Sequence, residues 1–251
     1  MTKLALCRHG QSEWNLQIRF TGWHDVDLTP LGEAEAAKGG ALLAAENIRF
    51  DGAFTSYQTR AIRTLWFALH ALNQCYVPVT KDWRLNERHY GGLTGLNKQE
   101  TRDKYGDEQV HIWRRSFDTP PPLIDTDSQY HPANDPRYQH VDPKELPGGE
   151  SLGLTLKRVV PYFDEAIAPK IMAGETLLIS AHGNSLRALL KHLFHVSDAE
   201  ISGYEFPTGN PLLLDLADGT LDVRGARYLD TERAKPLPPF GADLAKENQK
   251  H

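Results

Sequence analysis

Two short apolar runs, one near each end of the chain, lead into the same dipeptide, His-Gly. Residues 3–7 lead to Arg8-His9, and residues 176–181 lead to His182. A short continuous apolar run is typical of a strand buried on both faces, as in a parallel sheet. In an open α/β sheet, ligands bind beyond the carboxyl ends of the strands. The pattern therefore predicts an α/β fold in which both histidines reach one sheet edge and form one site.

Strand and helix signals alternate along the rest of the chain. The predicted helices follow caps or apolar periodicity and cover residues 30–47 after Thr29-Pro30, 57–72 with Ser56 as cap, 151–172 with interruptions at Pro161 and Pro169, and 185–194. The further predicted strands cover residues 52–55, 76–80 at a sheet edge because of Pro78, and 212–216. This alternation predicts a three-layer α/β/α fold with a mostly parallel central sheet.

The length of 251 residues suits one α/β domain, which we place at residues 1–230. Residues 119–149 hold seven prolines and little periodicity, and we expect a long loop that is either functional or disordered. Residues 231–251 are predicted to be a flexible tail. Its basic residues Arg233, Lys235, Lys246 and Lys250 make a lid over an anionic ligand one hypothesis and an inert tail the other.

Charge and composition exclude several functions. The net charge is −5 and 24% of residues are charged, so no basic surface for nucleic acid is expected. No apolar run approaches the roughly 18 residues of a membrane span, and the first residues lack the apolar region of a signal peptide. The two cysteines, Cys7 and Cys75, give no disulfide framework. We expect a cytoplasmic protein with no membrane partner.

The residues around His9 favour phosphate chemistry. Arg8 provides a rigid fork of donors, and Gly10 is expected to let the backbone approach a ligand closely. Ser12 and Asn15 add short hydrogen-bonding side chains at a predicted helix start. An ordinary imidazole titrates near about 6.5, so a neutral histidine is available near neutral pH. A nucleophilic histidine beside arginines suits phosphoryl transfer, where catalysis is mainly positioning and charge neutralisation.

Further charged residues converge on the same edge. Arg60 lies in the first turn of a predicted helix after a strand, although a surface arginine is the ordinary alternative. Glu87 and Tyr90 follow the third predicted strand, and Lys98, Arg114 and Arg115 come next in the chain. A lone carboxylate among cations stays ionised and can exchange a proton with a substrate hydroxyl. His192 and His195 share one helical face without a third ligand in sequence, so we predict no metal.

At this point the chain resembles the histidine phosphatase superfamily and, within it, the cofactor-dependent phosphoglycerate mutases. The resemblance begins with Arg8-His9-Gly10 and the distal His182-Gly183. Further blocks follow in family order: Phe20–Trp23, Thr55-Ser56 with Arg60-Ala61, Arg84–Gly91, Leu93–Lys98, Arg114–Asp118, Pro120–Pro122, Glu150–Leu152, Ala181–Arg187 and Pro207–Gly209. His24, Gly148-Gly149 and His195 depart from the usual pattern, and glycine is common at the position of His195.

The resemblance implies a role for each matching residue. His9 would be phosphorylated, Glu87 would be the general acid and base, and His182 would stabilise the transferring group. Arg8, Arg60 and Asn15 would hold that group, with help from the backbone at Gly183 and Asn184. The rest of the substrate would be bound by Ser12, Thr21, Gly22, Tyr90, Lys98, Arg114 and Arg115. The resemblance also implies interconversion of 3- and 2-phosphoglycerate, priming by 2,3-bisphosphoglycerate, no metal, and a homodimer or homotetramer.

Two related activities remain open beside the mutase. A phosphatase of the same superfamily would share both histidines with Arg8 and Arg60, whereas Glu87 to Arg115 and the 119–149 loop favour a closed site for a small anion. A bisphosphoglycerate synthase is the second alternative, against which Ser12 favours the mutase. A non-enzymatic binding module is disfavoured because every catalytic position of the family is filled.

Overall fold

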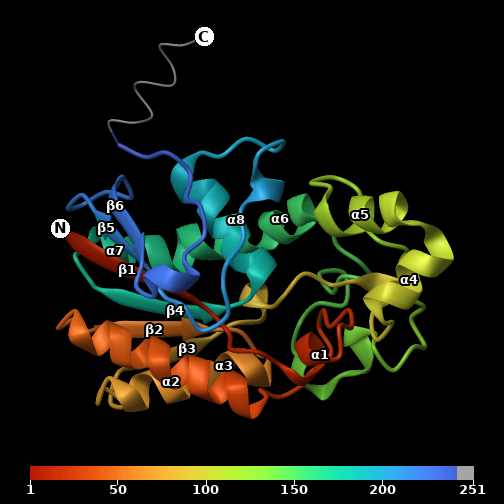
Figure 1. The fold of residues 1–251 in the computed structure, drawn as a ribbon, viewed down its shortest axis with the longest axis horizontal. Helices are drawn as coiled ribbons and strands as arrows, with labels where there is room; N and C mark the ends of the chain where they lie inside the picture. The colour runs from red at the N-terminus through yellow and green to blue at the C-terminus, as the bar shows by residue number, and fades with distance from the viewer. Residues whose placement is uncertain (242–251) are drawn as a thin grey trace, which may run out of the picture.

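The computed structural model describes residues 1–241 as an α/β fold built on one six-stranded sheet (Figure 1). Its strands are β1 (Thr2–Arg8), β2 (Gly52–Thr55), β3 (Val79–Lys81), β4 (Leu177–Ala181), β5 (Leu212–Leu216) and β6 (Val223–Tyr228). They lie in the order β3-β2-β4-β1-β5-β6. The first four are mutually parallel, whereas β5 is antiparallel to β1 and β6 is antiparallel to β5. The sheet is therefore mixed but mostly parallel, as predicted.

Helices cover both faces of the sheet (Figure 1). Their bounds are α1 (Glu13–Leu16), α2 (Pro30–Ala45), α3 (Thr59–Ala71), α4 (Lys98–Tyr105), α5 (Asp107–Arg115), α6 (Leu152–Tyr162), α7 (Ala168–Met172) and α8 (Gly183–Phe194). Figure 1 shows α2 and α3 on one face and α6, α7 and α8 on the other. The short helices α1, α4 and α5 lie beyond one end of the strands, where the functional site is found.

The central strand β1 separates two hydrophobic cores. Leu4 and Leu6 belong to the core under α6, α7 and α8, while Ala5 and Cys7 belong to the core under α2 and α3. Successive side chains of a strand point to opposite faces, so a strand covered by helices on both sides must be apolar throughout. This requirement explains the continuous apolar run in the sequence. No helix among residues 1–241 is long and apolar enough to cross a membrane.

Most predicted elements are confirmed, with corrections at their ends. The helix expected from residue 57 begins at Thr59, and its N-cap is Gln58 rather than Ser56. Ser56 accepts a hydrogen bond from the Gln58 amide, and its hydroxyl faces the site described below. The helix expected at residues 151–172 is divided into α6 and α7 by a π-helical turn at Phe163–Ile167. This turn lies between Pro161 and Pro169, which cannot supply backbone donors to a continuous helix.

Three regular elements were not predicted from the sequence. The edge strand β6 alternates buried and exposed residues only weakly, and α4 and α5 are short and polar. Residues 119–149 contain two short 3-10 turns, at Pro132–Asn134 and Pro136–Tyr138. Tyr138, in the second of these turns, is buried against Trp23, so part of the loop packs on the body of the protein.

His195 ends α8 in the left-handed conformation, with φ at 55°. Glycine adopts this conformation without the strain of a Cβ atom. We therefore expect His195→Gly to raise the free energy of unfolding by about 0.5–1 kcal/mol. Urea unfolding measures the difference, with His195→Ala as the control that keeps the strain. A destabilised glycine variant would contradict this explanation.

Candidate active site

The parallel pairing of β1 and β4 brings the two histidines together. Arg8 pairs with Ala181 in the sheet register, so the next residue of each strand is a histidine. The His9 amide donates to the Ala181 carbonyl at 3.0 Å, and the two imidazole centroids lie 5.0 Å apart. Both side chains are buried, at 2% and 0% exposure. The predicted meeting of the histidines at one sheet edge is confirmed.

His9 is held in one tautomer by the backbone. Its Nδ1 lies 2.7 Å from the Gly10 carbonyl oxygen, which can only accept a hydrogen bond, so Nδ1 carries the proton. Burial, reinforced by the charges of Arg60 and Arg8, lowers the pKa of His9 well below its usual value. The neutral ring therefore keeps a lone pair on Nε2 at neutral pH. This arrangement leaves Nε2 as the nucleophilic atom.

His182 is oriented by the end of β2. Its Nε2 lies 2.8 Å from the Ser56 hydroxyl, and its Nδ1 is buried without a protein partner in the described part of the chain. Burial is the main reason that the pKa of His182 is lowered far below its usual value, and Arg60 adds to the effect. A buried ring nitrogen without a partner is costly unless a ligand supplies the hydrogen bond.

Two arginines flank the histidines. Arg60 is 1% exposed in the first turn of α3, and it donates to the carbonyls of His24 and Gly22 at 3.1 and 2.9 Å. Burial lowers its pKa to about 10, which leaves the guanidinium charged at neutral pH. Arg8 donates to the Phe206 carbonyl at 2.9 Å, and its buried Nε has no protein partner among residues 1–241. Arg60 is thus a buried residue of the site and not a surface arginine.

Glu87 places a carboxylate beside this group. Its Oε1 accepts three hydrogen bonds: from the Arg88 amide at 2.7 Å, the Asn184 amide at 3.1 Å and the Asn184 side chain at 2.8 Å. Asn184 lies at the start of α8, directly after His182-Gly183. The start of α8 therefore fixes one carboxylate oxygen, and Oε2 receives no hydrogen bond from the described residues.

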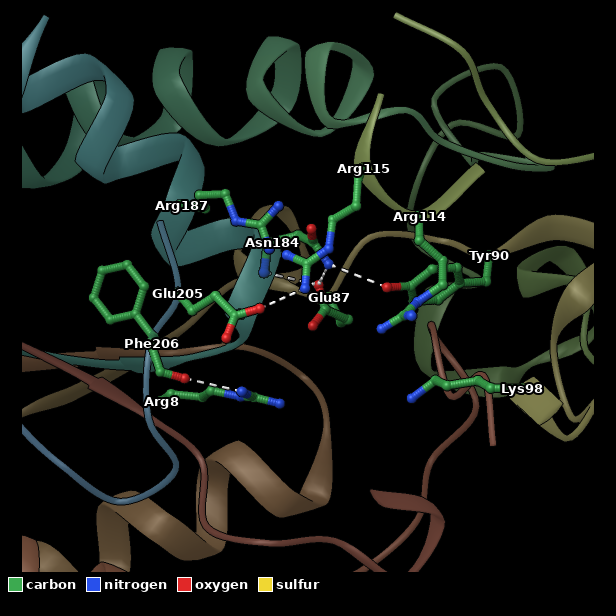
Figure 2. A pocket seen from close by; sticks show the side chains of 11 residues that line it. Arg8, Glu87, Tyr90, Lys98, Arg114, Arg115, Asn184, Arg187, Glu205 and Phe206 are labelled. Atoms are coloured by element: carbon green, nitrogen blue, oxygen red, sulfur yellow. Dashed lines mark hydrogen bonds and ion pairs between the residues drawn. The ribbon is translucent and has the colours of Figure 1, made fainter. Parts of the chain in front are cut away.

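The pocket has an inner and an outer part that share Arg8, Glu87, Tyr90 and Lys98. The inner part, of about 60 Å³, is also lined by His9, Asn15, Arg19, Thr21, Gly22 and Arg60. The outer part, of about 150 Å³, is also lined by Arg114, Arg115, Gly183, Asn184, Arg187, Glu205 and Phe206. Figure 2 shows the outer cations around the carboxylates of Glu87 and Glu205. Seven cations face two carboxylates, so the pocket suits a small, multiply charged anion.

The neighbouring cations also lower the pKa of Tyr90. Burial alone would raise its pKa, but the charges of Arg88 and Lys98 outweigh burial and lower it to about 8. The Arg88 guanidinium lies 4.7 Å from the Tyr90 ring centroid. Burial also lowers the pKa of Lys98 and of Arg114, in each case with further help from neighbouring arginines. The phenol is consequently a strong hydrogen-bond donor to an anion.

The structure shows a capping or packing role for two residues that the sequence connected with the ligand. The Ser12 hydroxyl does not line either part of the pocket, because it caps α1 and accepts from the Asn15 amide at 3.3 Å. Gly10 is required by packing: a Cβ there would lie 2.0 Å from the Gly32 carbonyl oxygen of α2. All other predicted site residues line the pocket or, as for His182, contact it through His9.

Four lining residues were missed: Arg19, Arg187, Glu205 and Phe206. Arg187 lies one turn into α8, just as Arg60 lies near the start of α3, so the same signal would have found it. It is 7% exposed, and burial lowers its pKa to about 10. Glu205 forms an ion pair with Arg115 across the outer part of the pocket (Figure 2). Nothing in the local sequence marks Glu205, since it lies in an irregular segment before β5.

The described residues contain no cluster of metal ligands, and of the tail's basic residues Lys235 lies near enough to Glu205 to help lower the pKa of that carboxyl, after the larger effect of Arg115. No group of three or more metal-ligating side chains occurs within residues 1–241, and His192 pairs instead with Asp164 at 3.0 Å. Arg233 is bound to Glu35 and Asp230 at 2.9 and 3.0 Å. Lys246 and Lys250 lie outside the described residues.

Comparison with known proteins agrees with this geometry. A model of the histidine phosphatase superfamily (branch 1) matches residues 4–129 and 123–226, which makes the chain a member of that superfamily. Proteins named 2,3-bisphosphoglycerate-dependent phosphoglycerate mutase from Maricaulis maris (strain MCS10) and Caulobacter sp. (strain K31) are 61% and 62% identical to it. The matches cover 96% of this chain and 99% and 100% of the two relatives. The chain therefore belongs to the 2,3-bisphosphoglycerate-dependent phosphoglycerate mutase family.

Solved structures support the fold alone. A mycobacterial glucosyl-3-phosphoglycerate phosphatase matches with a TM-score of 0.65 at 20% identity, over 91% of this chain and 97% of the other. A protein described as mycobacterial hydrolase 1 matches with a TM-score of 0.67, also at 20% identity, over 96% and 100% of the two chains. A phosphatase therefore shares the α/β architecture, which by itself does not identify an activity.

Burying neutral His9 and His182 makes stability depend on pH. Their lowered pKa values mean that, below about pH 6.5, the unfolded chain binds protons that the folded chain does not. The free energy of unfolding is expected to fall from pH 7 to pH 5, approaching about 1.4 kcal/mol per pH unit for each such histidine. Urea unfolding of His9→Gln should show a shallower slope, with exposed His111→Gln as control. An unchanged slope in His9→Gln would refute a neutral buried His9.

Proposed function

We propose that the protein interconverts 3-phosphoglycerate and 2-phosphoglycerate through a phosphohistidine at His9. The observation that carries this proposal is the tautomer of His9: a proton on Nδ1 and a free lone pair on Nε2, buried beside Arg8 and Arg60. A neutral nucleophile among permanent cations suits attack on an anionic phosphoryl group. When bound, 2,3-bisphosphoglycerate supplies the priming phosphoryl group, and the seven cations of the pocket fit so highly charged a molecule.

In the forward step, Nε2 of His9 forms a bond to phosphorus as the ester P–O bond breaks. Arg8, Arg60 and Asn15 are proposed to hold the phosphoryl oxygens, with the backbone of Gly183 and Asn184 close by. His182, whose ring is held by the Ser56 hydroxyl at Nε2 and lies beside His9, is proposed to stabilise the transferring group. These preorganised donors stabilise the charge that develops in the transition state.

Glu87 is proposed to move the proton. It gives a proton to the departing hydroxyl oxygen and takes one from the hydroxyl that later attacks the phosphohistidine. Its position between the inner and outer parts of the pocket, with Oε2 free of protein donors, supports this role. Thr21, Gly22, Tyr90, Lys98, Arg114 and Arg115 are proposed to bind the rest of the phosphoglycerate, and Ser12 acts by positioning Asn15.

A phosphatase of the same superfamily would also use both histidines. The outer part of the pocket favours the mutase, because Lys98 of α4 and the arginines at the end of α5 enclose a small anion and hold it during reorientation. A synthase of 2,3-bisphosphoglycerate needs the same enclosure, so the ratio of the two activities must be measured.

We further infer a cytoplasmic homodimer or homotetramer that needs no metal. The location is supported by two unpaired cysteines, one buried and one exposed. Association is supported by two exposed aromatic residues, Trp66 of α3 and Tyr76 of the segment before β3, which are 56% and 65% exposed. Sedimentation velocity tests the assembly, and retained activity in EDTA tests the absence of a metal requirement.

The activity is tested by a coupled enolase assay with and without 2,3-bisphosphoglycerate. We expect turnover that depends on this primer and that falls below about a thousandth of wild type in His9→Ala, since no other group can carry the phosphoryl. His111→Ala, on the exposed face of α5, is the matched control. Substantial isomerisation by His9→Ala would refute the assignment of His9 as nucleophile.

Glu205 forms an ion pair with Arg115, and we propose that it competes with the substrate for this arginine. Because an exposed ion pair is worth about 0.2–1 kcal/mol, Glu205→Gln is expected to tighten 2,3-bisphosphoglycerate binding by up to about fivefold. Isothermal titration calorimetry measures the Kd, and Glu200→Gln, an exposed carboxylate outside the pocket, is the control. Weaker binding in Glu205→Gln would show that Glu205 supports Arg115 and does not compete with the ligand.

A further inference from the structure

Glu87 lies in a segment that has no regular secondary structure of its own. Residues 86–90 follow a short 3-10 turn at Trp83–Leu85 and are neither helix nor strand. Backbone carbonyls in such a segment need partners when they are buried. The carbonyls of Asn86, Glu87 and His89 find their partners in residues about 60 to 75 positions further along the chain.

Arg158 of α6 supplies most of these partners. Its Nη1 donates to the carbonyls of Arg84 at 2.7 Å and Asn86 at 3.0 Å, and its Nη2 donates to the carbonyl of Glu87 at 2.9 Å. The remaining two N–H groups donate to the two carboxylate oxygens of Glu150, at 2.7 and 2.8 Å. A guanidinium has five N–H donors, and all five are used.

Glu150 completes the contact from the other side. Its Oε2 accepts from the His89 amide at 2.8 Å, and its own amide donates to the His89 carbonyl at 2.8 Å. The side chains of Arg158 and Glu150 are only 9% and 4% exposed. A buried pair of this kind is weakly stabilising by itself, because desolvation offsets the attraction of the charges. This pair differs from an ordinary buried ion pair because it also forms hydrogen bonds to the backbone around Glu87.

We propose that Arg158 and Glu150 are positioning residues that hold the Glu87 carboxylate in place for proton transfer. This inference rests on the proposed role of Glu87. Gln58 holds the Glu87 amide at 2.9 Å and Arg158 holds its carbonyl, so the backbone is fixed on both sides while Asn184 orients the carboxylate. Glu150 also directly follows the 119–149 loop. A displacement of the loop end would therefore move His89, which is hydrogen-bonded to Glu150, and with it the neighbouring Glu87.

Arg158→Lys tests the proposal, because lysine keeps the charge but loses the planar fork. We expect kcat of the mutase reaction to fall about 10- to 100-fold, as misplaced acid/base groups do, while KM stays within about twofold. Glu150→Gln should act in the same direction. Lys157→Ala, an exposed lysine on the adjacent position of α6, is the matched control and should behave as wild type.

A second readout separates positioning from loss of structure. With p-nitrophenyl phosphate, the N–P bond forms at His9 and the P–O bond breaks, and p-nitrophenolate leaves with the electron pair and needs no proton. The single-turnover burst of p-nitrophenolate should therefore be kept in Arg158→Lys. In a Glu87→Gln background, Arg158→Lys should lower kcat less than about twofold further, because the two residues act through one group.

Hydrogen exchange tests the contact independently of the reaction. The amides of residues 84–90 should exchange faster than in wild type in Arg158→Lys and at the wild-type rate in Lys157→Ala. This expectation does not depend on which reaction the enzyme catalyses. An unchanged kcat with faster exchange would overturn the positioning role. A parallel loss of kcat, burst and melting temperature would assign the pair to stability alone. A Glu87→Gln variant with wild-type kcat would refute the proposed function of Glu87, and the exchange result would still report on the contact.

Discussion

The site depends on the parallel pairing of β1 with β4. The hydrogen bond from the His9 amide to the Ala181 carbonyl continues the sheet by one residue and sets the two imidazoles 5.0 Å apart. β2 lies on the other side of β4, so Ser56 reaches His182 from the same edge. Slipping the register by one residue would turn every side chain of the strand to the opposite face, so the two hydrophobic cores that fix the register also fix the site.

The site combines neutral histidines with charged arginines, and this combination follows from burial and electrostatics. Neutral imidazoles coexist with Arg8 and Arg60 because burial and the arginine charges both oppose protonation. Several buried donors around the pocket remain without protein partners in the described chain, including the Nε atoms of Arg8 and Arg187. Leaving such groups without a hydrogen bond costs free energy. An anionic ligand that accepts these hydrogen bonds removes that cost. The donors of the pocket therefore suit an anion.

The sequence predicted the parts that follow from local patterns. Apolar runs predicted β1 and β4, and strand ends predicted where His9, His182 and Arg60 would meet. The packing of Gly10 against Gly32 was not predicted, because it joins distant segments and leaves no local trace in the sequence. Glu205 and the Arg158–Glu150 pair were missed for the same reason. Such contacts depend on how irregular segments pack, and hydrophobic periodicity does not report on that packing.

The central claim is that Nε2 of His9 carries the phosphoryl group. The most direct measurement is NMR of protein labelled with ¹⁵N-histidine, after brief exposure to 2,3-bisphosphoglycerate and an alkaline quench. We predict one phosphohistidine, with ³¹P coupled to Nε2 of His9, because the hydrogen bond of Nδ1 to the Gly10 carbonyl leaves Nε2 as the nucleophile in the folded protein. A phosphoryl group on Nδ1, on His182 or on any other residue would contradict the account.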